Sequence, residues 1–180
     1  MQLQQLIDKY YPAEPRLRQL LFTHSRYVAD KALETAARHP ELNADITFLE
    51  EGAMLHDIGI AGCDAPSIFC FGSLPYICHG IEGARILAED GLFRHARVCE
   101  RHTGSGLTAE EIIDEALPLP PRDMLPETIE EKIICYADKF FSKNPDALSV
   151  EKSIDKVIDG FKKFGEQPLK RFLQLHELLR

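Results

Sequence analysis

The sequence is poor in positive charge. Its 180 residues hold 21 Lys and Arg against 29 Asp and Glu, which gives a formal net charge of −8. Because nucleic acids and anionic membranes are polyanions, this balance argues against general binding to either of them. A local basic patch is still compatible with a small phosphorylated ligand.

Long apolar runs and paired cysteines are also missing. Residues 1–10 lack the basic start and apolar stretch of a signal peptide, and the weakly charged stretch 58–81 is broken by several Gly and Pro residues. The five cysteines are odd in number and include no C-x-x-C pair, which favours reduced thiols over a disulfide scaffold. We therefore expect a cytoplasmic protein that does not act at a membrane.

Several common catalytic and binding motifs are absent. There is no P-loop, no H-E-x-x-H and no G-x-S-x-G. Residues 104–109 match G-x-G-x-x-A, but helix-like sequence precedes them where that fingerprint needs a strand, so we expect a turn into a helix capped by Thr108 and Glu111. Cys63, Cys70 and Cys78 are spaced too widely to favour a thiolate metal site.

What the sequence does contain is helical periodicity. After Pro15, inward-type residues recur at spacings of three and four, as one helix face requires: Leu17, Leu20, Leu21, His24, Val28, Ala32 and Thr35. The same spacing predicts further helices at about 45–57, 79–90, 92–102, 127–141, 149–164 and 166–179. We find no convincing strand, and we expect residues 58–78 and 117–126 to be irregular. The predicted fold class is all-α.

Two local features carry further expectations. Gly59 is placed to end the second long helix as a left-handed cap. Residues 150–180 hold seven Lys and Arg and five Asp and Glu, a net charge of 7 − 5 = +2. We interpret that mildly basic pair of helices as a solvated face.

Metal-ligand side chains recur along these helices. His56 and Asp57 end an apolar helix, and Asp138 ends another apolar run, where an unpaired carboxylate would be costly to bury. His24 lies on the inward face of the first long helix, while His79 opens a helix and His102 closes one. Imidazole and carboxylate both suit divalent transition metals, and a metal would offset the cost of burying the acids.

The order H…HD…H…H…D resembles the HD superfamily of metal-dependent enzymes. The literal His56-Asp57-Ile58-Gly59 resembles its HDIG subgroup, and Arg101-His102-Thr103-Gly104 is similar to the same group. The resemblance covers about residues 24–143. It implies an all-α core of about five helices around the metals, with a single domain over 1–180, a core at about 14–143 and a C-terminal extension at 149–180.

The resemblance also implies a ligand set. One metal would be held by His24, His56, Asp57 and Asp138, and Asp57 would bridge to a second metal held by His79 and His102. Iron or manganese is then expected, and Asp57 is the expected catalytic residue. Two adjacent cations activate a bridging water and neutralise charge on a phosphoryl oxygen, which suits hydrolysis of a phosphate ester.

A phosphate substrate needs fixed donors around it, and four residues beside the ligands are candidates: Arg26, Arg101, Thr103 and Lys139. Lys143 lies one turn beyond Lys139. The aromatic residues of the irregular segment, Phe69, Phe71 and Tyr76, can stack on a base or serve as local anchors.

The function that this pattern predicts is a metal-dependent phosphohydrolase of a small phosphate ester, such as a nucleotide or a dinucleoside polyphosphate. Two alternatives remain open. One is a dinuclear iron oxygenase of the same superfamily, and the other is a non-catalytic binding or regulatory module with a structural metal. Three histidines fall outside the pattern: we expect His39 to be exposed, His95 to lie at the rim of the site and His176 to lie on the surface.

Overall fold

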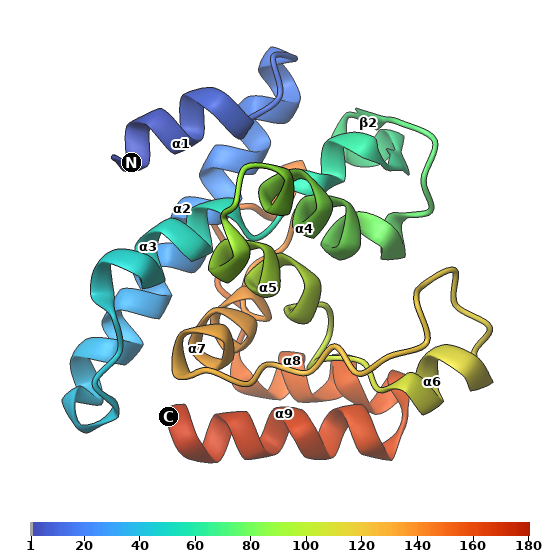
Figure 1. Ribbon diagram of the computed structural model, residues 1–180. Helices are drawn as coiled ribbons and strands as arrows, with labels where there is room; N and C mark the ends of the chain where they lie inside the picture. Colours follow the sequence, from blue (N-terminus) through green and yellow to red (C-terminus); the bar gives the residue numbers. More distant parts are fainter. Residues whose placement is uncertain (1) are drawn as a thin grey trace.

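The computed structural model describes residues 2–180 and is helical throughout most of them (Figure 1). The α-helices are α1 Leu3–Tyr10, α2 Pro15–Arg38, α3 Ile46–Leu55, α4 His79–Glu89, α5 Phe93–Arg101, α6 Ala109–Asp114, α7 Ile129–Asp138, α8 Ile154–Phe161 and α9 Glu166–Leu179. The strands are only β1 Asp64–Ala65 and β2 Cys70–Phe71, paired antiparallel. The predicted all-α class is confirmed. Among the described residues, no helix is both long and apolar enough to cross a membrane.

The helix starts follow from local capping chemistry. Pro15 occupies the first turn of α2, and Asp45 accepts a hydrogen bond from the Phe48 N–H at the start of α3. Thr108 opens α6 with the expected capping box, and Thr128 opens α7 with another. The predicted turn before α6 is confirmed, since Gly104 and Gly106 adopt φ of 59° and 86°.

The core joins the long helices to the C-terminal pair. All seven residues of the predicted inward face of α2 are buried. In Figure 1, α8 and α9 lie side by side beneath α7, and their contact is aromatic: the Phe172 ring stacks on Phe161 at a centroid distance of 4.6 Å and on Tyr136 at 5.8 Å. The buried apolar side chains from Leu6 to Leu179 form one continuous cluster. The C-terminal helices are therefore packed into the core and are not merely a solvated face.

Some predicted boundaries were wrong. Helix α8 begins at Ile154, because Ser153 caps it and residues 149–152 are not helical, and α7 ends at Asp138. Helix α1 was not predicted, and Ile46, assigned to the inward stripe of α3, is 52% exposed. The segment 58–78, predicted to be irregular, contains short 3₁₀ turns and the two-residue strands.

Gly59 does not cap a helix as predicted. It lies in a 3₁₀ turn, Ile58–Gly62, with ordinary backbone geometry, and its small size is what matters there. A Cβ at this position would come within 2.1 Å of the His79 carbonyl oxygen and 2.4 Å of the Gly83 nitrogen. Gly59 thus lets α4 pack directly against the turn that follows Asp57.

We predict that Gly59→Ala destabilises the fold by about 3 kcal/mol, because the added methyl group meets backbone that cannot move independently. Gly160→Ala is the matched control: it sits in α8 with nothing within 4 Å of the added Cβ, and it should gain up to about 1 kcal/mol. Urea denaturation followed by circular dichroism measures both. Unchanged stability of Gly59→Ala would contradict the close approach.

Candidate metal centre

Six buried side chains from five helical segments meet at one point. His24 comes from the middle of α2, His56 and Asp57 follow the end of α3, His79 begins α4, His102 follows α5 and Asp138 ends α7. They form two groups that can each hold a metal ion: His24, His56, Asp57 and Asp138, and then Asp57, His79 and His102. Within each group the ligand atoms lie within 4.8 Å of one another. Asp57 belongs to both.

In the first group, two histidines face two carboxylates. His24 Nε2 lies 3.3 Å from Asp57 Oδ2 and 3.0 Å from Asp138 Oδ1. His56 Nε2 lies 3.1 Å and 3.4 Å from the same two oxygen atoms. One oxygen of each carboxylate therefore faces both imidazoles.

In the second group, the other oxygen of Asp57 faces the remaining histidines. Asp57 Oδ1 lies 3.6 Å from His79 Nε2 and 3.3 Å from His102 Nε2, and those two nitrogen atoms are 3.1 Å apart. Asp57 thus divides its two oxygens between the two groups, which is the geometry of a bridging carboxylate.

Three of the histidines are oriented by the backbone in the same way. Nδ1 of His56 lies 2.6 Å from the Ala53 carbonyl oxygen, Nδ1 of His79 lies 2.8 Å from that of Tyr76, and Nδ1 of His102 lies 2.8 Å from that of Cys99. Each acceptor is three residues earlier in the chain. A carbonyl accepts only from an N–H, so Nδ1 carries the proton and Nε2 presents its lone pair to Asp57.

The inward atoms are short of hydrogen bonds. Within residues 2–180, His56 Nε2 and both carboxylate oxygens of Asp57 are buried without a hydrogen bond of good geometry. They nevertheless lie close together, as the distances above show. Buried polar atoms are normally paired, so atoms that converge without pairing fit the donor set of a cation better than a hydrogen-bond network.

The electrostatics of the cluster are dominated by burial. Burial by itself would raise the pKa of Asp57, but the charges of His56 and Lys143 hold that pKa well below its usual range. Burial would lower the pKa of His56, yet Asp57 and Asp138 raise it to about 9. Burial and the neighbouring His102 lower the pKa of His79 to about 3. His79 is thus neutral, the form in which imidazole binds a metal.

Two lysines reach the cluster from the end of α7. Lys139 Nζ lies 2.6 Å from Asp138 Oδ2 and donates to the His102 carbonyl oxygen at 2.9 Å. Lys143 Nζ lies 2.7 Å from Asp57 Oδ2 and 3.8 Å from Asp138 Oδ1. The sequence placed Lys143 only one turn beyond Lys139. Its direct contact with Asp57 depends on the helix ending at Asp138, which helical periodicity alone did not reveal.

The remaining predicted substrate-binding residues are engaged elsewhere. Arg26 pairs with Asp30 at 2.8 Å and with Glu50 at 2.6 Å. Arg101 pairs with Glu127 at 2.6 Å and donates to the Leu125 carbonyl oxygen at 2.9 Å. Thr103 is half-buried beside Gly80 of α4. None of these three contacts brings a side chain to the two groups around Asp57.

The three histidines outside the pattern are less exposed than expected. His95 is buried, with Nε2 3.1 Å from Glu51 and its ring against Phe48, so its predicted rim position was wrong. His176 is half-buried and accepts or donates a 2.9 Å hydrogen bond with the Tyr136 hydroxyl. His39 contacts Glu41 and the C-terminal Arg180 carbonyl oxygen. All five cysteines are free and buried, so the expected absence of a disulfide scaffold is confirmed for the described residues.

Sequence reasoning gave Tyr76 no settled role. Its ring stacks on His79 with centroids 4.8 Å apart and 22° between the planes, and its carbonyl orients the same imidazole. The short turn Tyr76–Cys78 immediately before His79 was the signal, because residues just ahead of a helix start lie beside its first side chain.

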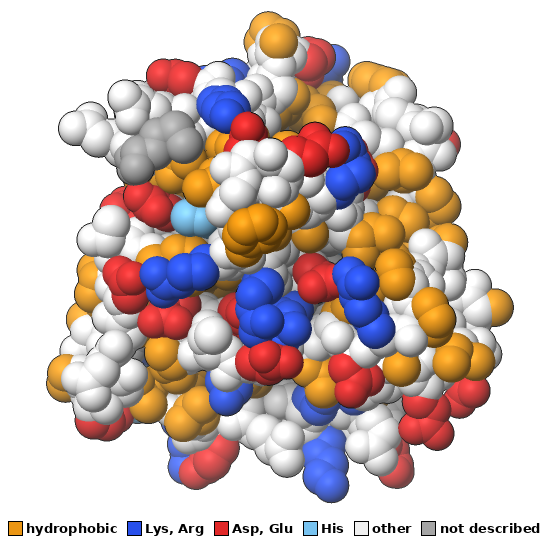
Figure 2. Space-filling view, viewed as in Figure 1, with side chains coloured by type: hydrophobic (Ala, Val, Ile, Leu, Met, Phe, Trp, Pro, Cys, Tyr) orange, Lys and Arg blue, Asp and Glu red, His pale blue; other side chains and the backbone are white. Residues whose placement is uncertain are grey.

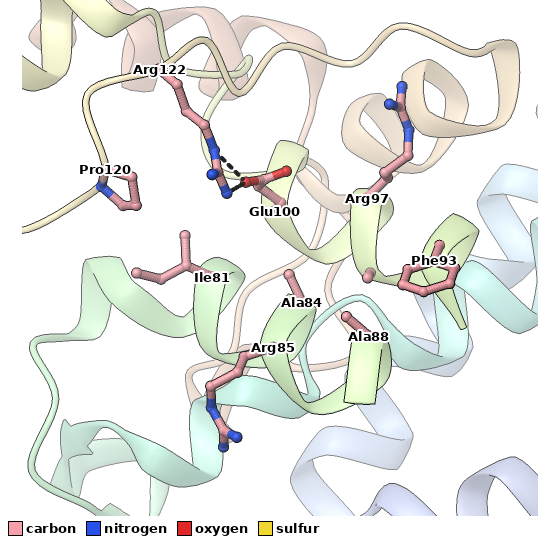
Figure 3. A pocket seen from close by; sticks show the side chains of 10 residues that line it. Ile81, Ala84, Arg85, Ala88, Phe93, Arg97, Glu100, Pro120 and Arg122 are labelled. Atoms are coloured by element: carbon pink, nitrogen blue, oxygen red, sulfur yellow. Dashed lines mark hydrogen bonds and ion pairs between the residues drawn. The ribbon is translucent and has the colours of Figure 1, made fainter. Parts of the chain in front are cut away.

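A larger surface pocket lies away from the cluster. It has a volume of about 560 Å³ and an apolar floor from α4 and α5, including Ile81, Ala84 and Ala88, with Arg85, Arg97 and Arg122 around it (Figure 3). The Arg122 guanidinium is turned to Glu100. On the face shown in Figure 2, acidic and basic side chains are interspersed and form no broad patch of one sign. None of the pocket's lining residues belongs to the two groups around Asp57.

A comparison with protein families matches the HD domain model to residues 21–142. An uncharacterized protein of Methanocaldococcus jannaschii is 36% identical over 159 residues, which is 85% of this chain and 81% of that protein. Two proteins named tRNA (cytidine(56)-2'-O)-methyltransferase, from Thermoplasma volcanium and Picrophilus torridus, are 33% and 35% identical over 161 residues, or 88% and 89% of this chain. The chain spans 41% of the length of each methyltransferase. No solved structure matches the chain significantly.

The shared carboxylate generates a prediction about metal content. We expect the protein to take up about two Mn²⁺ ions per chain, one for each ligand group. Asp57→Ala should lose both because it serves both groups, whereas His102→Ala should keep about one. Plasma mass spectrometry after desalting measures the content, and His95→Ala is the matched control because its imidazole faces Glu51 instead. Equal losses in Asp57→Ala and His102→Ala would contradict a bridging role.

Proposed function

The chain belongs to the HD domain family, and on that premise we propose that it is a metal-dependent phosphohydrolase of a small phosphate ester. The observation that carries the proposal is the position of Asp57, whose two oxygens face separate groups of histidines. A purely structural metal needs one closed set of ligands, whereas a shared carboxylate between two open groups suits catalysis.

The residues present fit two divalent transition metals. His24, His56, Asp57 and Asp138 would hold one ion, and Asp57, His79 and His102 would hold the other, with iron or manganese favoured by the mixture of imidazole and carboxylate. Such a pair, when bound, supplies an activated water and stabilises charge on a phosphoryl oxygen.

The chain's own residues supply positioning and charge. The carbonyls of Ala53, Tyr76 and Cys99 keep three Nε2 atoms aimed at Asp57. Lys139 and Lys143 bring ammonium groups to the carboxylates, where they would hold the oxygens of a phosphate. The buried walls exclude bulk water, which strengthens each of these charge interactions. Arg26 and Arg101 would need to leave their present carboxylate partners to contribute, so we favour the lysines.

Three other functions have been weighed against this one. An HD-type iron oxygenase would use a similar ligand order, and a non-catalytic metal module would use the same fold. The methyltransferase activity in the names of two relatives belongs to proteins more than twice as long as the matched region. The M. jannaschii protein, matched over 81% of its length, carries the region with little besides. We therefore assign the methyl-transfer function to the rest of those longer chains.

The proposal is tested by a screen of phosphate esters under nitrogen and under air. Protein reconstituted with Mn²⁺ or Fe²⁺ is assayed for phosphate release from sugar phosphates, nucleotides, dinucleoside polyphosphates and a phosphorylated tRNA end. We expect metal-dependent phosphate release without oxygen, lost by at least about a hundredfold in Asp57→Ala and retained in His95→Ala. A strict requirement for oxygen would favour the oxygenase, and release from none of the esters would overturn the hydrolase.

A further inference from the structure

A second pocket opens beside the metal-type cluster and is strongly cationic. It lies between the end of α7 and helix α8 and has a volume of about 390 Å³, within the range of small-molecule sites. Its ionisable lining consists of four lysines, Lys139, Lys143, Lys152 and Lys156, and one acid, Asp138. The lining charge is therefore 4 − 1 = +3 in a chain whose net charge is −8.

The four lysines fall into two pairs. Lys139 and Lys143 contact Asp138 and Asp57 at the cluster. Lys152 and Lys156 come from the segment that leads into α8 and from α8 itself, beyond the family match at residues 21–142. Within the described part of the chain, neither Lys152 nor Lys156 forms an ion pair with a carboxylate. The outer pair is thus unneutralised.

Lys152 is held in place despite its unfavourable surroundings. Its backbone N–H donates to the Phe140 carbonyl oxygen at 2.8 Å, and its Nζ points inward to the Lys139 carbonyl oxygen at 3.4 Å. The side chain is half-buried, and burial together with the charges of Lys139 and Lys143 lowers its pKa. Ammonium groups gathered in this way repel one another, and an anionic ligand would relieve that repulsion.

We propose that this pocket binds a ligand with two anionic groups. Lys139 and Lys143 hold the first group at the cluster, and Lys152 and Lys156 hold the second. The chemical class is a diphosphate, a bisphosphate or a phosphate that also carries a carboxylate. The aromatic side chains of Phe141, Phe161 and Phe164, which line the same pocket, receive the organic part of the ligand. This inference rests on the proposed function only in placing the first group beside the cluster.

Binding of two non-hydrolysable probes tests the inference without relying on activity. Methylphosphonate carries one anionic group and methylenediphosphonate carries two. Isothermal titration calorimetry of the metal-loaded protein should show the diphosphonate binding about tenfold more tightly or better, because the second group gains charge-assisted hydrogen bonds. Metal content is measured after each titration, since diphosphonates also chelate metals.

Variants locate the second anionic site. Lys152→Ala with Lys156→Ala should weaken the diphosphonate by about tenfold and methylphosphonate by less than about twofold. Lys170→Ala, an exposed lysine of α9 outside this pocket, should change neither affinity. Retained metal content and an unchanged circular dichroism spectrum show that the double variant is folded. Equal weakening of both probes, or no weakening of the diphosphonate, would overturn the inference.

The experiment also separates this inference from the proposed function. Preferential diphosphonate binding that depends on Lys152 and Lys156, in a protein that hydrolyses no ester, supports the pocket and overturns the hydrolase. Ester hydrolysis that is insensitive to these two lysines, with no preference for the diphosphonate, supports the hydrolase and overturns the pocket.

Discussion

The structure depends on one buried carboxylate. Asp57 is fully removed from solvent, and an isolated charge in that environment would cost several kcal/mol or more, on the order of what holds a whole domain together. The chain meets that cost by bringing His24, His56, His79 and His102 and the Lys143 ammonium around it. Each partner arrives on a different helix or helix end, so the helix packing and the charge arrangement constrain each other.

The glycines next to α4 show how far this constraint reaches. His79 can approach Asp57 only if α4 lies directly on the turn after α3, and Gly59 removes the side chain that would keep them apart. Gly83 faces the Cys99 side chain across the same contact and lets α5 pack closely as well. The same packing brings His102 to the cluster. Small residues here serve the placement of imidazoles rather than turn geometry.

The ligand set could be predicted because each member has a local signature. His24 shares the inward period of α2, and Asp138 ends an apolar run where a carboxylate otherwise has no reason to be. The surrounding charges could not be predicted, because their partners are distant in sequence: Arg26 meets Glu50, and Lys143 turns back to Asp57. The basic composition of residues 150–180 was visible, but its aim depends on how α8 packs beside α7. The division into a core at 14–143 and an extension stays a prediction.

The buried cysteines have a practical consequence. Burial raises the pKa of Cys63, Cys70 and Cys135 to about 11 and that of Cys99 well above its usual value, so the reactive thiolate is scarce while the protein is folded. Cys99 also lies across from Leu55, with its sulfur 3.2 Å from that carbonyl oxygen, in the layer that supports His56 and His102. Alkylation of these thiols therefore proceeds only through opening of the molecule, and its rate is a clock for how often the centre is breached.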